Sequence, residues 1–142
     1  MILYMDTSAL AKRYVEEEST SDVLGWMESA DLVGTALITR AEMAAVLARA
    51  MRLKRLDGAD ALKILDFFRA EWMNFQRLPV NEASVSQADV LAFEYGLRGY
   101  DAVHLASALI WQDGLGTPVT LATFDGELRA VALQVGLSVL PE

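Results

Sequence analysis

Short apolar runs alternate with longer segments of helical spacing along this chain, and the alternation restricts the possible folds more than any other feature. The runs at residues 2–5 and 119–123 are the clearest strands. Leu65, Phe68 and Trp72 recur at the spacing of one helix face. Strands that alternate with helices predict an α/β fold, a three-layer sandwich in which helices flank a mainly parallel central sheet.

The predicted elements cover most of the chain. We predict strands over residues 2–5, 32–35, 77–80, 119–123 and 137–140, and helices over residues 8–17, 20–29, 39–53, 57–75, 82–95, 100–112 and 126–135. Thr20 or Ser21 is expected to cap the second helix, and Gly96 and Gly136 are expected to end two others. The chain has 142 residues and no linker, repeat or low-complexity segment, so we expect a single domain over residues 1–142.

Four acidic residues lie where a predicted strand or loop gives way to a helix: Asp6, Glu42, Asp101 and Asp125. In parallel sheets, sites form beyond the carboxyl ends of the strands. Several carboxylates gathered there repel one another, and a divalent cation is the usual reason to tolerate this. Mg²⁺ and Mn²⁺ take oxygen ligands, and such a site can activate water and neutralise charge on a phosphodiester.

Each acid, taken alone, also fits an ordinary role at a helix start. Asp is a good N-cap, worth about 1 kcal/mol, and Asp6, Asp101 and Asp125 all lie at or just before predicted helices. The hydroxyl residues after Asp6 are able to cap the first helix instead, which would leave Asp6 free of this role. The segment from Thr39 to Glu42 fits a capping box, in which the Glu side chain accepts a hydrogen bond from the cap residue's amide.

Several segments of the chain resemble the PIN-domain ribonucleases. The opening residues 1–10 are similar to the start of that family. The block at residues 97–109, centred on Tyr100-Asp101-Ala102-Val103-His104-Leu105-Ala106, is similar to the VapC toxins of bacterial and archaeal toxin–antitoxin pairs. Thr123-Phe124-Asp125 and Thr39-Arg40-Ala41-Glu42 are similar to the family's other acidic motifs, in the same order and at about the same spacing over the whole chain.

The resemblance implies a PIN-like fold and a metal-dependent endoribonuclease. It implies that all four acids are catalytic residues of a Mg²⁺ or Mn²⁺ site. Asp6 and Asp101 would be the primary metal ligands, and Glu42 and Asp125 would complete the acidic pocket by holding the metal directly or through water. Two hydroxyl residues are implied as contacts of the ligands or of a substrate phosphate: Ser8 and Thr123.

The resemblance also implies partners. The substrate is expected to be RNA, with tRNA as a common target class. A small cognate antitoxin, VapB-like, is expected to cover the active-site groove, and the chain is expected to form a homodimer. Hydrophobic residues make up 54% of the sequence, which fits surface buried in an oligomer or against a partner.

Three further features suggest contacts at the site. Arg40 and Arg98 lie near the acids in sequence, where they are candidates to contact phosphate or balance charge. His104 lies three residues after Asp101 and is expected to be a structural residue with one hydrogen bond rather than a general base. The densest basic cluster suits either a solvated helix end, which we favour, or RNA phosphates; it consists of Arg49, Arg52, Lys54 and Arg55.

Bulk composition restricts the function further. The net charge of −8 argues against non-specific nucleic-acid binding, so a nuclease must act locally through bound metal and a few arginines. The chain has no cysteine, which excludes disulfides and thiolate metal sites and fits a cytoplasmic location. No window of 18 uninterrupted apolar residues is present, so no membrane span is expected.

Two other functions remain open from the sequence. A receiver domain is also an acidic, magnesium-binding α/β domain, but it needs an acidic pair at the first strand and a lysine after a late strand. Asp6 has no acidic neighbour, and the only lysines, at positions 12, 54 and 63, lie in or directly after predicted helices. A non-catalytic module that binds RNA or protein in the same groove is the second alternative.

Overall fold

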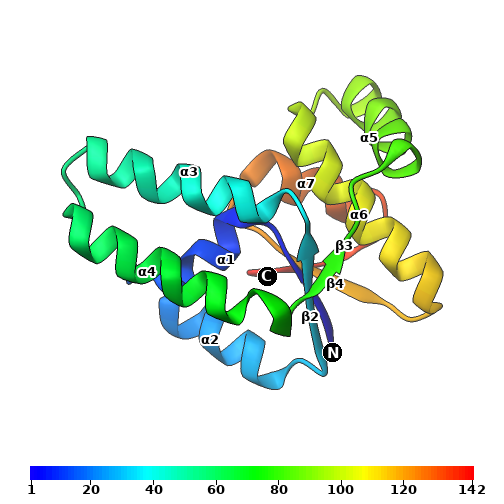
Figure 1. Ribbon diagram of the computed structural model, residues 1–142. Coiled ribbons are helices and arrows are strands. Elements are labelled where there is room, and N and C mark those ends of the chain that lie inside the picture. Colours follow the sequence, from blue (N-terminus) through cyan, green and yellow to red (C-terminus); the bar gives the residue numbers. More distant parts are fainter.

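The computed structural model describes residues 1–142. Its centre is a five-stranded parallel sheet, and helices lie around this sheet (Figure 1). The strand order is β3-β2-β1-β4-β5, and every neighbouring pair is parallel. The strands are β1 (Ile2–Met5), β2 (Leu32–Ala36), β3 (Gln76–Leu78), β4 (Val119–Ala122) and β5 (Ser138–Leu140). The predicted three-layer α/β sandwich is therefore confirmed, with a sheet that is parallel throughout.

Seven α-helices connect and cover the strands, and each predicted helix is present. They are α1 (Thr7–Tyr14), α2 (Thr20–Ser29), α3 (Thr39–Arg52), α4 (Gly58–Glu71), α5 (Glu82–Tyr95), α6 (Gly99–Leu115) and α7 (Gly126–Gln134), and a 3-10 turn, η1 (Trp72–Asn74), follows α4. None of these helices combines the length and the apolar character that crossing a bilayer requires.

The start of α2 differs from its prediction. The predicted cap of α2 at Thr20 or Ser21 is wrong, because Ser19 occupies the N-cap position and makes no capping bond with its side chain. Thr20 is the first helical residue, and its hydroxyl accepts a hydrogen bond from the Glu17 amide at 2.8 Å. The hydroxyl therefore stabilises the turn before α2. Gly96 and Gly136 do end their helices, with φ of 69° and 90°.

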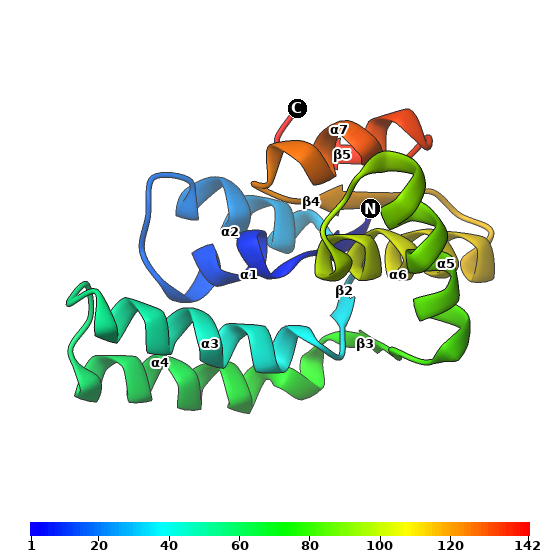
Figure 2. The ribbon, with the colours of Figure 1, turned by 90° about the horizontal axis from the view of Figure 1, so that it is seen from above.

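Two hydrophobic cores lie on opposite faces of the sheet. Helices α1 to α4 cover one face, and α5 to α7 cover the other (Figure 2). The side chains of β1 alternate between the two cores: Leu3 and Met5 pack with residues of α1 to α4, and Tyr4 packs with residues of α5 to α7. This alternation follows from the two-residue period of a strand. Full burial of one large apolar side chain contributes about 1.5–3 kcal/mol, so β1, buried on both faces, anchors both cores.

A close contact between β2 and α6 fixes the position of α6 over the sheet. A Cβ atom added to Gly34 in β2 would lie 2.6 Å from Cζ3 of Trp111 in α6. Only a residue without a side chain lets the indole ring lie this close to the strand backbone. Since Asp101 and His104 are carried by the same helix, this contact helps to position them.

The chain reverses its direction across the sheet between β1 and β4. It runs from β1 outward to β2 and β3, and it then returns to place β4 on the other side of β1. The Asp6 amide donates a hydrogen bond to the Ala122 carbonyl at 3.2 Å, so the segments that follow β1 and β4 lie side by side. Such a switch point is where open α/β sheets bind ligands. The strand order also differs from the 2-1-3-4-5 order of receiver domains.

Candidate active site

All four predicted acids line one cleft of about 550 Å³ at the carboxyl edge of the sheet. Asp6 follows β1, Glu42 lies in the first turn of α3, Asp101 lies in the first turn of α6, and Asp125 precedes α7. The other polar residues that line the cleft are Thr7, Ser8, Arg49, Arg52, Arg98, Tyr100 and His104. The fold therefore brings together acids that are separated by up to 119 positions in the sequence.

Asp6 is buried and bonded entirely to neutral donors. One carboxylate oxygen accepts hydrogen bonds from the Ser8 hydroxyl at 2.7 Å and the Ala9 amide at 2.9 Å, and the other accepts from the Thr123 hydroxyl at 2.6 Å. Asp6 thus caps α1, and the idea that a neighbouring hydroxyl residue releases it from this role is wrong. Burial raises the pKa of Asp6 despite these hydrogen bonds, so its charge is held at a cost when no cation is near.

Two hydroxyl groups support this carboxylate from behind. Ser8 Oγ accepts a hydrogen bond from the Phe124 amide at 2.9 Å, and Thr123 Oγ1 accepts one from the Asp125 amide at 3.1 Å. They therefore join the segment after β4 to the start of α1. Ser8 also lines the cleft, whereas Thr123 is fully buried and does not. This places Thr123 against the Asp6 carboxylate and away from the space open to a substrate.

Glu42 faces the cleft, and the capping-box interpretation of its segment is wrong. Ile38 occupies the N-cap position of α3, and the Thr39 hydroxyl bonds to that of Thr35 at 2.7 Å. Glu42 Oε1 instead accepts hydrogen bonds from Thr7 Oγ1 at 2.8 Å and from His104 Nε2 at 2.7 Å. Burial opposes the charge of Glu42, but His104 and Thr7 outweigh it and hold the pKa of Glu42 below its usual value.

His104 links the cleft to the centre of the sheet. It is 2% exposed, and besides Glu42 it bonds through Nδ1 to the Tyr4 hydroxyl at 2.8 Å. Burial raises the pKa of Tyr4 well above its usual value, so the phenol stays neutral. The ionised Glu42 carboxylate can only accept hydrogen bonds, so His104 Nε2 carries a proton and donates it to Glu42. His104 therefore makes two hydrogen bonds, where the sequence predicts a structural residue with one. The sequence does not predict the contact between His104 and Tyr4.

Arg98 joins the remaining two acids. Its Nε donates to Asp101 at 3.0 Å, and its Nη2 donates to Asp125 at 2.6 Å. The other Asp125 oxygen accepts from the Leu128 amide at 2.8 Å and caps α7, as its position predicts. Asp101 does not cap α6, because Arg98 occupies the N-cap position there. The hydrogen bond and charge of Asp101, with the charge of Asp125, raise the pKa of Arg98.

The donor chemistry of the cleft suits a hard divalent cation. No three acidic or histidine side chains approach closely enough to ligate one ion together in this conformation. Magnesium, however, usually keeps several waters and binds one or two carboxylates directly. Two acids fit that mode of binding. Asp6 is buried and makes no hydrogen bond to a basic side chain, and Asp101 has one carboxylate oxygen free of hydrogen bonds.

The basic residues divide between the cleft and other surfaces. Arg49 and Arg52, one helical turn apart on α3, line the cleft and make no ion pair. Lys54 and Arg55 do not line it, and neither does Arg40, which is exposed at the start of α3. Half of the basic cluster that we assigned to a solvated helix end therefore lies beside the acids.

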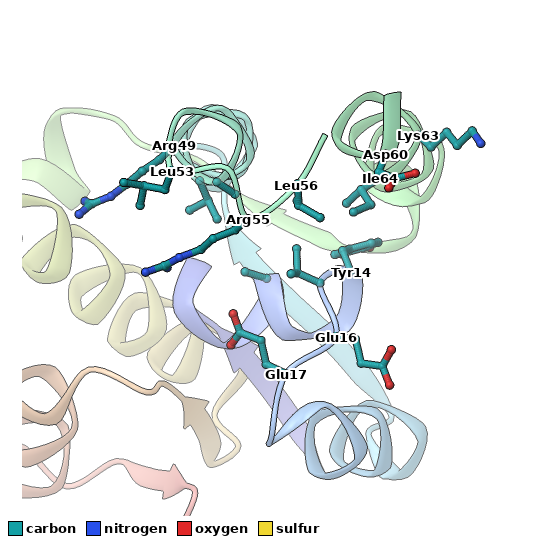
Figure 3. Close-up of a pocket in the computed structure, with 14 residues that line it drawn as sticks. Tyr14, Glu16, Glu17, Arg49, Leu53, Arg55, Leu56, Asp60, Lys63 and Ile64 are labelled. Atoms are coloured by element: carbon teal, nitrogen blue, oxygen red, sulfur yellow. The ribbon is translucent and has the colours of Figure 1, made fainter. Parts of the chain in front are cut away.

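A second and larger hollow adjoins the acidic cleft. It has a volume of about 780 Å³ and lies between α1 and the α3–α4 pair (Figure 3). Tyr14 lines it from α1, and Leu53, Leu56 and Ile64 line it from the other side. Two residues of α3 line both spaces: Val46 and Arg49. The acidic cleft thus continues into a mainly apolar groove.

Comparisons with known proteins agree with this geometry. A family model described as PIN domain matches residues 3–134. Proteins named Ribonuclease VapC45 and Ribonuclease VapC49, both of Mycobacterium tuberculosis, are each 31% identical over 144 residues, covering 99% of this chain and 95% of theirs. Among solved structures, PAE2754 from Pyrobaculum aerophilum has a TM-score of 0.66 at 23% identity, covering 98% of this chain and 83% of that one. VapBC-5 from Mycobacterium tuberculosis, described as a toxin–antitoxin system, has a TM-score of 0.59 at 19% identity, covering 98% and 96%.

Proposed function

Because the chain belongs to the PIN domain family, we propose that it is a metal-dependent endoribonuclease that acts as the toxin of a toxin–antitoxin pair. Relatives named ribonuclease VapC, at 31% identity over nearly the whole chain, support this function. The observation that carries the proposal is that all four acids line one cleft together with two arginines that have no acidic partner.

The four acids have different proposed roles in the site. Asp6 and Asp101 would hold Mg²⁺ or Mn²⁺, and Glu42 and Asp125 would complete the negative field around it. A bound divalent cation supplies an activated water and neutralises charge on the phosphodiester that is hydrolysed. His104 holds Glu42 in one orientation through its 2.7 Å hydrogen bond, so the carboxylate does not have to be ordered when substrate arrives.

Arginines of α3 would bind the RNA backbone. Arg49 and Arg52 lie in the same cleft as the acids and are free to meet phosphate oxygens. The overall electrostatic field of a chain with a net charge of −8 does not attract RNA, so these local contacts must orient the RNA strand. We infer that tRNA or another structured RNA presents a phosphodiester to the acids while an adjacent phosphate lies against the arginines.

The surface offers a place for each implied protein partner. A VapB-like antitoxin would fill the apolar groove between α1 and the α3–α4 pair, and it would reach the acids across Val46 and Arg49. A second copy of the chain would cover the outer face of α5, where Phe93 is 94% exposed and Val90 is 58% exposed. Large apolar side chains left this open are typical of protein interfaces.

Cleavage of total RNA by the purified, antitoxin-free chain tests the catalytic proposal. Cleavage is expected with Mg²⁺ or Mn²⁺, is lost with EDTA, and falls by at least about a hundredfold in Asp101→Asn, because the variant removes a direct ligand. Asp113→Asn is the matched control, since Asp113 is an exposed acid on the same helix. Full activity in Asp101→Asn would refute the carboxylate site. RNA binding without any cleavage would favour a non-catalytic binding module.

A further inference from the structure

The acidic cleft contains one full positive charge that contacts its acids directly, and the chain itself supplies it. Arg98 bridges Asp101, three positions away on α6, and Asp125, which lies 27 positions away at the start of α7. Both carboxylates are largely buried, with side chains that are 17% and 22% exposed. Arg98 therefore joins two elements that the sheet only brings near each other.

The bridge occupies two carboxylate oxygens that would otherwise be open to a cation in the cleft. It takes one oxygen of Asp101 and the only oxygen of Asp125 that does not cap α7. Asp6 and Glu42, by contrast, are held by hydroxyls, a backbone amide and His104. Without the guanidinium, the charges of Asp101 and Asp125 would face each other with no neutralising partner.

The Arg98 side chain is also free to move away from the two carboxylates. Its side chain is 72% exposed, so the guanidinium reaches water without a large change in its solvation. Ion pairs of this exposure are weak, and a hard cation that binds carboxylate oxygens directly can displace them. Arg49 and Arg52 line the same cleft without touching an acid, so the arrangement is specific to Arg98.

We propose that Arg98 is an exchangeable counter-cation: it holds Asp101 and Asp125 together in the metal-free protein and is displaced from them when a divalent cation binds. The inference rests on the proposed metal-dependent function and adds a positioning residue to it. Arg98 keeps the two carboxylates assembled before the cation arrives, and it sets a threshold that the cation must exceed. Substitution of Arg98 should therefore strengthen metal binding.

Calorimetric titration of the antitoxin-free protein with Mn²⁺ and with Mg²⁺ tests this competition without reference to cleavage. Arg98→Gln is expected to bind the ion about three- to tenfold more tightly than wild type, because an exposed bridge of two bonds no longer competes. Arg98→Lys, which keeps the charge but not the two-pronged geometry, should lie between them. Arg49→Gln removes a cation from the same cleft that contacts no acid, and it should bind within about twofold of wild type.

The Nε–H resonance of Arg98 gives a second readout. In the metal-free wild type, the hydrogen bond to Asp101 should protect this proton from exchange with water, so its resonance should be visible. Saturation with Mg²⁺ should remove this resonance. Unchanged or weaker metal binding by Arg98→Gln, or a bridge that persists in saturating Mg²⁺, would overturn the inference while leaving the nuclease intact. If neither wild type nor Arg98→Gln binds a divalent ion, the inference and the metal of the proposed function fail together.

Discussion

Asp6 combines three duties in one buried side chain. It caps α1, it receives the hydroxyls of Ser8 and Thr123, and it is the proposed ligand at the centre of the cleft. Only the third duty requires a negative charge, because an amide oxygen caps a helix as well as a carboxylate does. Burial raises the pKa of Asp6, so we expect the charge itself to work against the metal-free fold.

The substitution Asp6→Asn is therefore expected to separate stability from activity. The variant should lose RNA cleavage, yet in EDTA it should be more stable than wild type by on the order of 1 kcal/mol, because the disfavoured charge is gone. Urea unfolding in EDTA measures the difference, with Asp113→Asn as the neutral control. A variant that is less stable than wild type in EDTA would show that the carboxylate charge supports the fold.

At the scale of single residues, local sequence signals predict some of the residues in the candidate site and miss others. The four acids can be found because each lies at a boundary between elements, which the sequence marks. The true partner of Glu42 cannot be found in this way, because His104 lies 62 positions away and the local pattern offers a capping box instead. Tyr4 gives no signal either: it lies in an apolar strand, and its partner is 100 positions distant.

At the scale of elements, α1 is fastened to the end of α4 by a small polar cluster. Arg13 forms a two-pronged ion pair with Glu71 at 2.9 and 2.5 Å, and the Tyr14 hydroxyl donates to the same carboxylate at 2.6 Å. The hydrogen bond from Arg13 is the main reason that the pKa of Glu71 lies below its usual value, against a smaller effect of burial. The contact sets one wall of the apolar groove, since Tyr14 lines it.

Glu71→Gln should therefore weaken the fold in a pH-dependent way. A lowered pKa in the folded state means that the carboxylate stabilises the protein above its unfolded pKa, and that this contribution is lost as the pH falls through the folded pKa. We expect a loss of about 1 kcal/mol at pH 7. Below the folded pKa of Glu71, wild type and variant should converge. Chemical unfolding at several pH values measures this.

The exposed acid Glu94 on α5 provides the control for this prediction. Glu94→Gln should track wild type at every pH, because no basic side chain contacts it. A Glu71→Gln variant with the same deficit at all pH values would contradict the account, since the loss would then come from packing rather than from charge.

The elements themselves could be predicted well, and their contacts could not. Hydrophobic periodicity and glycine stops mark all five strands and seven helices, because these signals act over a few residues. In the sequence, Gly34 looks like a glycine that merely weakens a strand. The structure explains why a glycine is needed there: Trp111, 77 positions later, packs where a side chain of residue 34 would lie. Contacts of this kind depend on which elements the sheet order brings together.

At the scale of the whole molecule, a strongly acidic protein is proposed to bind an acidic polymer. The net charge of −8 makes RNA binding depend on the few cations that face the cleft. Replacement of Arg49 and Arg52 by Gln should weaken RNA binding and reduce the slope of log affinity against log salt by about 1.4 to 1.8. Each neutralised phosphate adds about 0.7 to this slope in a single strand and about 0.9 in a duplex.

Filter binding at several salt concentrations, on the Asp101→Asn background to prevent cleavage, measures both quantities. Arg40→Gln is the matched control, because Arg40 lies on the same helix but outside the cleft. Equal slopes for wild type and the double variant would show that these arginines do not contact phosphate.

One helix, α3, forms a wall of both the acidic cleft and the apolar groove, and Val46 and Arg49 face both spaces. A substitution at either position would alter both the proposed RNA-binding cleft and the proposed antitoxin groove. In the divergence of such toxin–antitoxin pairs, a change that adapts the enzyme to a new RNA would also alter how its own inhibitor fits. Substrate choice and immunity would then evolve together at these two positions, and cross-reaction between related pairs should be most sensitive to them.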